Sequence, residues 1–186
     1  MSDIYGAVEI RSVGIWLSVI DISSLLMKHF DLHGCLFGID NYAGYSPLFA
    51  DRGLPPDCSD AILTDTQQYM SENGHPSWVL WSELRVVDWQ ERAPVRDQRI
   101  TEFIREEESE IKVTKWLNDP NWAWVRAALD RDPEAEILAD GRVFRRLVLR
   151  RSDCLVDTDF PLLMELMACL AERFGDDNVR MVVWFD

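Results

Sequence analysis

The sequence predicts an α+β fold: a single compact domain, residues 1–186, with an N-terminal β-hairpin, several helices and a C-terminal strand-helix-strand unit. Three observations lead to this prediction. Polar and apolar residues alternate at the N-terminus, capped helical segments follow, and two strand patterns flank an apolar helix at the C-terminus. The 186 residues, 47% of them hydrophobic, suffice for one sizeable core, and no internal repeat or low-complexity linker divides them.

The N-terminal hairpin is predicted from two strand-like segments and the turn between them. Residues Ile4 to Ile10 alternate, and Trp16 to Ile20 is again rich in strand-forming residues. Ser12-Val13-Gly14 between them is typical of a hairpin turn. The stretch from Asp31 to Phe37 fits either a short helix or a buried loop, because its pattern is too short to decide.

Four helices are predicted from their end signals. Ser59, Ser82 and Asp159 stand at N-cap positions, and Gly175 follows the last helix. The helices are expected from Asp60 to about Met70 with Glu72-Asn73-Gly74 closing it, over a turn or two from Glu83 to Trp89, from Asp119-Pro120 through Leu129, and from Phe160 to Phe174 with Pro161 in its first turn. The last of these is apolar nearly all round and is therefore expected to be central to the core.

A charged section from Glu91 to Lys115 is interpreted as a further helix. Apolar side chains can be aligned on one side of it, and Glu106-Glu107-Glu108 falls on the other side as a solvated face. The aligned positions are Ile100, Phe103, Ile104, Ile111 and Trp116.

The C-terminal strands are predicted from alternation and from apolar content. Asp140-Gly141 signals a turn, and Arg142 to Arg150 alternates after it. Asn178 to Phe185 has little polar face and is expected to be a buried strand. Because Arg142, Arg146 and Arg150 share one side of the first strand, they form either a cationic stripe or pairs with neighbouring carboxylates, and both interpretations stay open.

The charge limits the partners that the chain can have. Its formal net charge is −14, from 33 acidic and 19 basic residues, and no basic tail stands apart. Such a chain is repelled by phosphate backbones and anionic lipid and is attracted to basic partners. This argues against non-specific nucleic-acid binding. It favours a solvated surface, or a surface that mimics nucleic acid or grips a basic protein.

The cysteines and the hydropathy pattern predict a soluble protein of a reducing cytoplasm. Cys35, Cys58, Cys154 and Cys169 are far apart, without the spacing of a redox or zinc motif, and no signal peptide is recognised. Cys169 lies in an apolar run and is expected to be a small core residue. No run approaches the ~18 apolar residues of a membrane span.

The candidate ligand site lies between Asp51 and Trp89. The motifs Arg52-Gly53-Leu54-Pro55 and His75-Pro76-Ser77-Trp78 each set a turn beside side chains able to hold a ligand. Both fall at helix entrances or in the loops that lead to them, where free N–H groups suit an anion. The predicted ligand-binding residues are Arg52, His75, Ser77, Trp78 and Trp89.

A set of short motifs carries a resemblance to a known family. The motifs are Phe30-Asp31-Leu32, Asp40-Asn41, Arg52-Gly53-Leu54-Pro55, Asp57, His75-Pro76-Ser77-Trp78, Glu83-Leu84, Asp88-Trp89 and the terminal strand from Val179. In their spacing they resemble a family of small uncharacterised proteins found in bacteria and their phages, over about residues 1–90 and the last strand. The family's second motif reads His-Ser-His-Ser-Trp, from which Gly74 departs. The resemblance implies a bacterial or phage setting and a shared site at Arg52, His75, Ser77 and Trp78.

No catalytic residue, metal ligand or cofactor is predicted. His29 and His33 are spaced i, i+4 with Asp31 nearby, but no further ligands complete a metal site. A hydrolase remains a third functional reading, although no nucleophile elbow or triad signature supports it. Its residues would be His75, oriented by Asp88 or Glu83, with Ser77 or Cys58 as the nucleophile.

The sequence favours a binding protein over an enzyme. In the first version, an acidic inhibitor grips and neutralises a basic partner protein, as immunity proteins do in bacterial defence or toxin conflict. In the alternative, a phage-type protein sequesters an anionic, nucleotide-like signalling ligand between Arg52, His75 and the Trp78 or Trp89 ring. In a further interpretation, the motifs have no binding role and only stabilise the fold, with Arg52 fixing a loop through an ion pair with a carboxylate. The whole-chain charge favours the first version, and the oligomeric state is not predicted.

Overall fold

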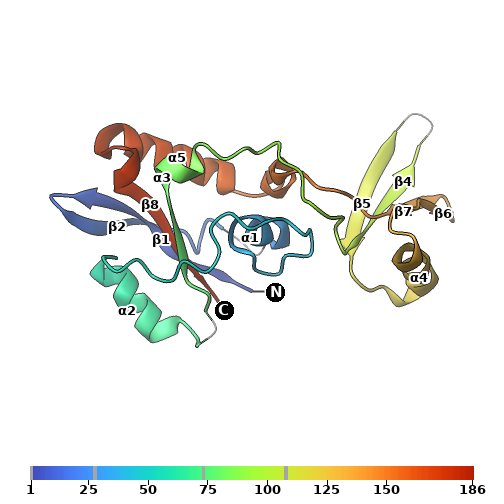
Figure 1. The fold of residues 1–186 in the computed structure, drawn as a ribbon, viewed down its shortest axis with the longest axis horizontal. Helices are drawn as coiled ribbons and strands as arrows, with labels where there is room; N and C mark the ends of the chain where they lie inside the picture. The colour runs from blue at the N-terminus through green and yellow to red at the C-terminus, as the bar shows by residue number, and fades with distance from the viewer. Residues whose placement is uncertain (1, 27–28, 73, 107–108) are drawn as a thin grey trace.

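The computed structural model describes residues 2–26, 29–72, 74–106 and 109–186, and their strands form two antiparallel sheets of four (Figure 1). The strand order is β2-β1-β8-β3 in the first sheet and β5-β4-β7-β6 in the second. The strands are β1 (Ile4–Ser12), β2 (Ile15–Asp21), β3 (Ser77–Leu80), β4 (Ile100–Arg105), β5 (Glu110–Trp116), β6 (Ile137–Ala139), β7 (Arg142–Arg145) and β8 (Val179–Phe185). The α-helices are α1 (Phe30–Phe37), α2 (Asp60–Tyr69), α3 (Trp81–Leu84), α4 (Ala123–Arg131) and α5 (Phe160–Phe174), with 3-10 turns η1 (Pro120–Trp122), η2 (Arg151–Leu155) and η3 (Asp176–Asn178).

The predicted α+β class is confirmed. The N-terminal hairpin is β1 and β2, and the strand, helix and strand expected near the C-terminus are β7, α5 and β8. However, β7 and β8 belong to different sheets, so the C-terminal helix connects the two sheets and does not cross over within one.

The first sheet buries both of its faces because its strands alternate. Val8 and Ile10 of β1 pack in the main core with Leu163 and Met167 of α5. On the opposite face, Ala7 packs with Ile62 of α2, in a smaller cluster. Helices α5 and α2 therefore cover opposite faces of the first sheet (Figure 1).

The second sheet has a small core of its own. Ile100 of β4 and Phe144 of β7 pack with Val125 and Leu129 of α4. The connections to and from this sheet lie side by side: the Asp97 N–H donates to the Leu147 carbonyl at 2.8 Å, and the Ala93 N–H donates to Leu149, also at 2.8 Å. The segment from 98 to 146 thus leaves the part of the molecule that contains the first sheet and returns to it at one place (Figure 1).

The helix expected within 91–115 is wrong, because the structure has the hairpin of β4 and β5 there. Ile100 to Phe103 are buried without a break between β5 and β7, and the Glu106 N–H donates to the Ser109 carbonyl at the turn. Short apolar runs fit a strand and a helix equally well, and pairing with two neighbouring strands selects the strand here. Glu107 and Glu108 lie outside the described residues.

Other local predictions are confirmed or corrected by the helix ends. Ser59 caps α2, its side chain accepting from the Ile62 N–H, and the short segment at Phe30–Phe37 is a helix. Ser82 is not an N-cap, because α3 begins at Trp81. Asn73, in the predicted closing turn of α2, lies outside the described residues.

The prediction that Cys169 is a core residue is wrong, because its side chain is exposed. Only one side of α5 is buried, through Phe160, Leu163, Met167 and Ala171. Leu162 and Leu166 are exposed on the helix, so its nearly uniform apolar sequence overstated its burial.

The three arginines of the predicted C-terminal strand do not form a stripe. The strand β7 ends at Arg145, so alternation does not continue to Arg150. Arg142 pairs with Glu102, Arg146 binds Asp130 at 2.6 Å, and Arg150 donates to the Gln90 side chain at 2.8 Å. The interpretation that these arginines pair with neighbouring carboxylates is therefore borne out for Arg142 and Arg146, whereas the Arg150 side chain binds an amide oxygen.

Candidate functional site

The first predicted motif is held by a bidentate ion pair. Arg52 Nη1 and Nη2 lie 2.8 and 2.9 Å from the two carboxylate oxygens of Glu83. The guanidinium also lies over the rings of Phe49 and Trp78, with its carbon 5.0 and 5.3 Å from their centroids. The hydrogen bonds from Arg52 lower the pKa of Glu83. Two of the donors that an anionic ligand would need are therefore occupied by Glu83.

The second motif lies against the first. Ser77 is completely buried at the start of β3, and its hydroxyl donates to the Phe49 carbonyl. The Gly53 N–H donates to the Pro76 carbonyl at 3.0 Å. The structure thus brings Arg52, Ser77 and Trp78 together, which the sequence predicted.

His75 lies beside this group, whereas Trp89 does not. The His75 Nδ1 is 3.7 Å from Asp51 Oδ1, and 55% of its side chain is exposed. Its φ of 42° is left-handed, which favours glycine and makes this turn unusual for histidine. Trp89 packs instead against Phe160 in the main core, with ring centroids 6.3 Å apart.

The groups that a hydrolase would need beside His75 have other contacts. Ser77 is buried and donates to a backbone carbonyl, and Glu83 holds Arg52. Asp88 accepts the Gln90 N–H at 2.9 Å. Burial raises the pKa of the Cys58 thiol, which opposes the thiolate that a nucleophile requires.

A groove that the sequence reasoning missed runs between β2 and α2. It consists of two adjoining hollows of about 500 and 560 Å³ that share Ser18, and we call them together the α2 groove. Its members come from β1, β2, α2, β8 and the loops beside them. The first hollow is lined by Gly14, Ile15, Trp16, Leu17, Ser18, Asp57, Cys58, Ser59, Asp60 and Ala61. The second is lined by Tyr5, Gly6, Ala7, Ser18, Asp21, Ser23, Asp65, Tyr69, Trp184 and Asp186.

The α2 groove is strongly acidic. No lysine or arginine is among the described residues that line it, and residues 53–84 contain neither residue type. Asp21, Asp60, Asp65 and Asp186 have no salt bridge within the described part of the chain. The carboxylates therefore create a negative potential that the site itself does not neutralise.

A buried ion network supports the wall of the first hollow. Arg180 Nε lies 2.7 Å from Glu9 Oε2, and Arg180 Nη1 lies 2.8 Å from Asp57 Oδ1. The guanidinium carbon is 3.8 Å from the centroid of Trp16, whose indole N–H donates to Asp57 at 2.9 Å. The bond from Arg180 and the one from Trp16 hold the pKa of Asp57 below its usual range. Asp57 therefore stays ionised while Trp16 is fixed.

The floor of the second hollow is aromatic. Tyr5 and Trp184 stack with ring centroids 6.2 Å apart and an interplanar angle of 17°. Trp184 is 3% exposed, and its indole nitrogen has no hydrogen-bond partner among the described residues. Tyr69 of α2 is 60% exposed above this floor. Aromatic faces beside carboxylates suit cationic side chains, which interact with both.

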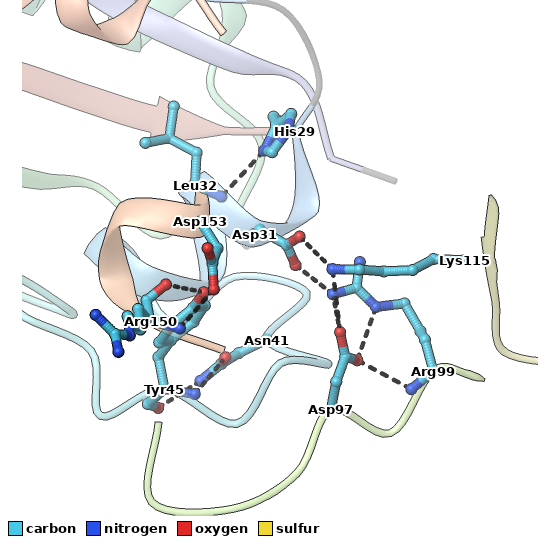
Figure 2. Close-up of polar contacts among 10 residues, drawn as sticks. All are labelled: His29, Asp31, Leu32, Asn41, Tyr45, Asp97, Arg99, Lys115, Arg150 and Asp153. Atoms are coloured by element: carbon cyan, nitrogen blue, oxygen red, sulfur yellow. Dashed lines mark hydrogen bonds and ion pairs between the residues drawn. The ribbon is translucent and has the colours of Figure 1, made fainter. Parts of the chain in front are cut away.

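A second charge network lies at the junction of the two sheets, and its acidic and basic side chains pair with one another. Figure 2 shows Arg99 and Lys115 directed at Asp31 and Asp97. Lys115 Nζ of β5 lies 2.8 Å from Asp31 Oδ2 and 3.3 Å from Asp97 Oδ2, and Arg99 pairs with both carboxylates. Burial raises the pKa of Asp31, but the charges of Lys115 and Arg99 outweigh it, so the net shift is downward. Two acids and two bases neutralise each other here, which suits a structural junction.

The two histidines of α1 do not gather metal ligands. Among the described residues, no group of three or more His, Cys, Asp or Glu side chains is arranged to hold a metal ion. His29 caps α1 by accepting the Leu32 N–H at 3.2 Å (Figure 2). His33 is 1% exposed and packs edge-on against Phe185, with ring centroids 5.3 Å apart.

Burial of His33 predicts acid sensitivity. Burial lowers the pKa of His33 to about 4, from an ordinary value of 6.5. Between pH 6.5 and about pH 4, His33 binds a proton in the unfolded chain but not in the folded chain. The free energy of unfolding therefore decreases as the pH falls through this range. The loss approaches about 3 kcal/mol at its acid end. Chemical unfolding measured from pH 7.5 to 4 should show a flatter pH dependence for His33→Leu, and equal slopes would contradict the assignment.

Two cysteines that are isolated in the sequence meet in the fold. Cys35 of α1 and Cys154 of η2 are both fully buried. The hydrogen bond from Cys154 lowers the pKa of Cys35, and Arg151 Nη1 lies 3.5 Å from its sulfur. Arg151 also binds Glu91 at 3.0 Å, so this group ties α1 and η2 together.

Comparisons with known proteins add no relative: no family model, curated protein or solved structure matches the chain. The resemblance carried by the short motifs therefore stays a prediction. Within the residues described, no helix combines the length and the apolar content needed to cross a bilayer.

Proposed function

We propose that the protein is a non-enzymatic acidic inhibitor that binds and neutralises a basic partner protein at the α2 groove. The observation that carries this proposal is the unneutralised acid of the groove, where Asp60 and Asp65 line hollows that contain no cation of their own. Following the motif resemblance, the setting that we propose is the bacterial cytoplasm, for a protein of phage or bacterial origin that acts in bacterial defence or toxin conflict.

Charge and shape contribute differently to such binding. A negative cleft attracts a basic protein over several ångströms and raises the association rate, an effect that salt weakens. Exposed and half-exposed aromatic rings then supply the contact area that keeps the complex together. Tyr5, half-buried and stacked on the buried Trp184, provides such a ring without a large loss of side-chain entropy, and Tyr69 of α2 adds an exposed one.

The alternative, a site for an anionic nucleotide-like ligand at Arg52 and His75, stays a prediction. It requires Arg52 to exchange its two bonds to Glu83 for bonds to the ligand. Trp78 would offer its ring for stacking, but the Arg52 guanidinium already lies over that ring. Because such a ligand would carry the same sign as the whole chain, the basic-partner proposal uses the charge and this alternative works against it.

The test compares two doubly substituted proteins that lose the same negative charge. Asp60→Asn/Asp65→Asn changes the α2 groove, whereas Glu165→Gln/Glu172→Gln changes exposed positions on α5, across the sheet. A basic protein captured from bacterial lysate is purified, and its dissociation constant is measured against increasing salt. We expect the groove variant to bind about tenfold more weakly, or about 1.4 kcal/mol, and the α5 variant to bind like the unmodified protein.

Two results would contradict the proposed function. Binding that does not weaken with salt would remove the electrostatic basis of the interaction. Equal losses in the groove and α5 variants would mean that net charge matters and the groove does not.

A further inference from the structure

The strand β2 has a free edge beside the α2 groove. It is the outer strand of its sheet and, among the described residues, it pairs only with β1 (Figure 1). Proteins usually protect such an edge with lysine, proline or a covering segment. Within Ile15–Asp21 neither lysine nor proline occurs, and a register irregularity opposite Val8 and Glu9 interrupts the pairing only near Val19. The edge from Ile15 to Ser18 is regular and open to an added strand.

The two faces of β2 differ sharply in chemistry. Leu17 lies opposite Ile10, on the face that carries α5, and Ile15 shares that face. Leu17 is 42% exposed and Ile15 is 60% exposed. The side chains of Trp16 and Ser18 alternate with these and point to the other face, and all four residues line the first hollow of the α2 groove. An added strand would therefore meet an apolar surface on one side and an acidic, aromatic surface on the other.

We propose that the partner is recognised through an extended segment that adds to the free edge of β2 and alternates basic with apolar residues. This inference rests on the proposed function, and it defines the chemistry of the partner's recognised segment. The basic residues enter the α2 groove, and the apolar residues between them cover Ile15 and Leu17.

The spacing of the groove fits this alternation. Residues i and i+2 of a strand lie on the same face, roughly 6.6–6.8 Å apart. The two hollows adjoin at Ser18, so consecutive basic residues of one strand reach both hollows. The alkyl stem in the second hollow passes beside Tyr5 and Tyr69, and the charged ends meet Asp60 in one hollow and Asp65 in the other. Main-chain bonds to β2 supply affinity, as in other cases of strand addition.

A second copy of the chain is a poorer occupant of the same edge. Two copies joined along β2 would bring two acidic grooves together, each within a molecule of net charge −14. Like charges held at short range oppose such pairing. The charge complementarity therefore points to a basic segment from a different protein.

The test uses four synthetic peptides of equal charge. The first alternates lysine and valine over seven residues, starting and ending with lysine. The second has the same composition in two blocks. The third and fourth are the alternating peptide with N-methyl groups on every second amide, in the two possible registers, each of which prevents strand pairing along one edge. All carry blocked ends, and fluorescence anisotropy gives their dissociation constants. We expect the alternating peptide to bind at least tenfold more tightly than the block peptide. It should also bind at least tenfold more tightly than the weaker of the two N-methylated peptides.

Substitutions separate the two faces of the strand. Ile15→Ser/Leu17→Ser should weaken the alternating peptide by about threefold to tenfold and the block peptide by a smaller factor, because only the ordered strand places every valine on that face. Asp60→Asn/Asp65→Asn should weaken both peptides. Thermal melting of the variants checks that the exposed substitutions leave the fold intact.

The outcomes distinguish this inference from the proposed function. If the alternating and block peptides bind equally, and both depend on Asp60 and Asp65, strand addition is overturned while the acidic binding function stands. If no peptide binds, both the strand-addition inference and the proposed function are contradicted. Light scattering should show a monomer, and a dimer abolished by Ile15→Ser/Leu17→Ser would assign the edge to a second copy and overturn the inference.

Discussion

Replacing Arg99 by methionine is expected to lower the free energy of unfolding by about 3–5 kcal/mol. Asp97 is completely buried and Asp31 nearly so, and Arg99 binds both. Without the guanidinium, Lys115 alone would compensate two buried carboxylates (Figure 2). Methionine keeps most of the side-chain volume, so the measured loss reports the charge and its hydrogen bonds. Urea unfolding at neutral pH provides the measurement.

The matched control for Arg99→Met is an arginine whose ion pair is in water. Arg85 Nη1 lies 2.9 Å from Asp176 Oδ2, but both side chains are roughly half exposed. Such pairs contribute about 0–1 kcal/mol, so Arg85→Met should cost less than about 1 kcal/mol. If Arg99→Met were as mild as Arg85→Met, the junction of the two sheets would not depend on the buried network.

Replacing Arg180 by methionine is the second large effect, again about 3–5 kcal/mol. Glu9 is completely buried opposite Arg180, and the other contact of its carboxylate is the Ser59 N–H at 2.7 Å. The substitution would leave this carboxylate without a cation. It would also free Asp57 and remove the cation over the Trp16 ring. Unfolding followed by tryptophan fluorescence measures both the stability and the surroundings of Trp16.

The double substitution Glu9→Gln/Arg180→Met serves as the control for Arg180→Met. Removing both charges avoids an uncompensated buried carboxylate, so the double variant should recover part of the loss. A double variant that is as unstable as the sum of the single ones would show that the ion pair is not what Arg180 contributes.

Local signals in the sequence predicted the elements whose structure depends on near neighbours. Ser59 caps α2 as expected, Gly175 follows α5, and β8 is the buried strand that its apolar run indicated. Caps and turns act over a few residues, so their effect is visible in the chain itself.

The second sheet was not predicted because its strands form through distant pairing. The β4 sequence fits the helical period as well as the strand period, and its pairing with β7, about 40 residues later, selects the strand. Cys169 was misplaced for a related reason: α5 is apolar beyond the side that the sheet can cover.

The candidate site likewise has one part that the sequence predicted and one part that it did not. The contact of Arg52 with Trp78 joins two motifs that stood out as turns with ligand-type side chains. The α2 groove did not stand out, because it draws on residues from Tyr5 to Asp186. Its supporting pair, Glu9 with Arg180, spans nearly the whole chain, so no window of sequence contains it.

The adjacent connections at Asp97 and Leu147 have a consequence for how this architecture can vary. Because the chain leaves and returns across two adjacent backbone hydrogen bonds, an exchange of the second sheet that keeps Arg99 and Lys115 leaves the strand order of the first sheet unchanged. The α2 groove and the free edge of β2 lie wholly in the part that such an exchange leaves untouched. The second sheet is therefore the natural position for a fused tag or reporter.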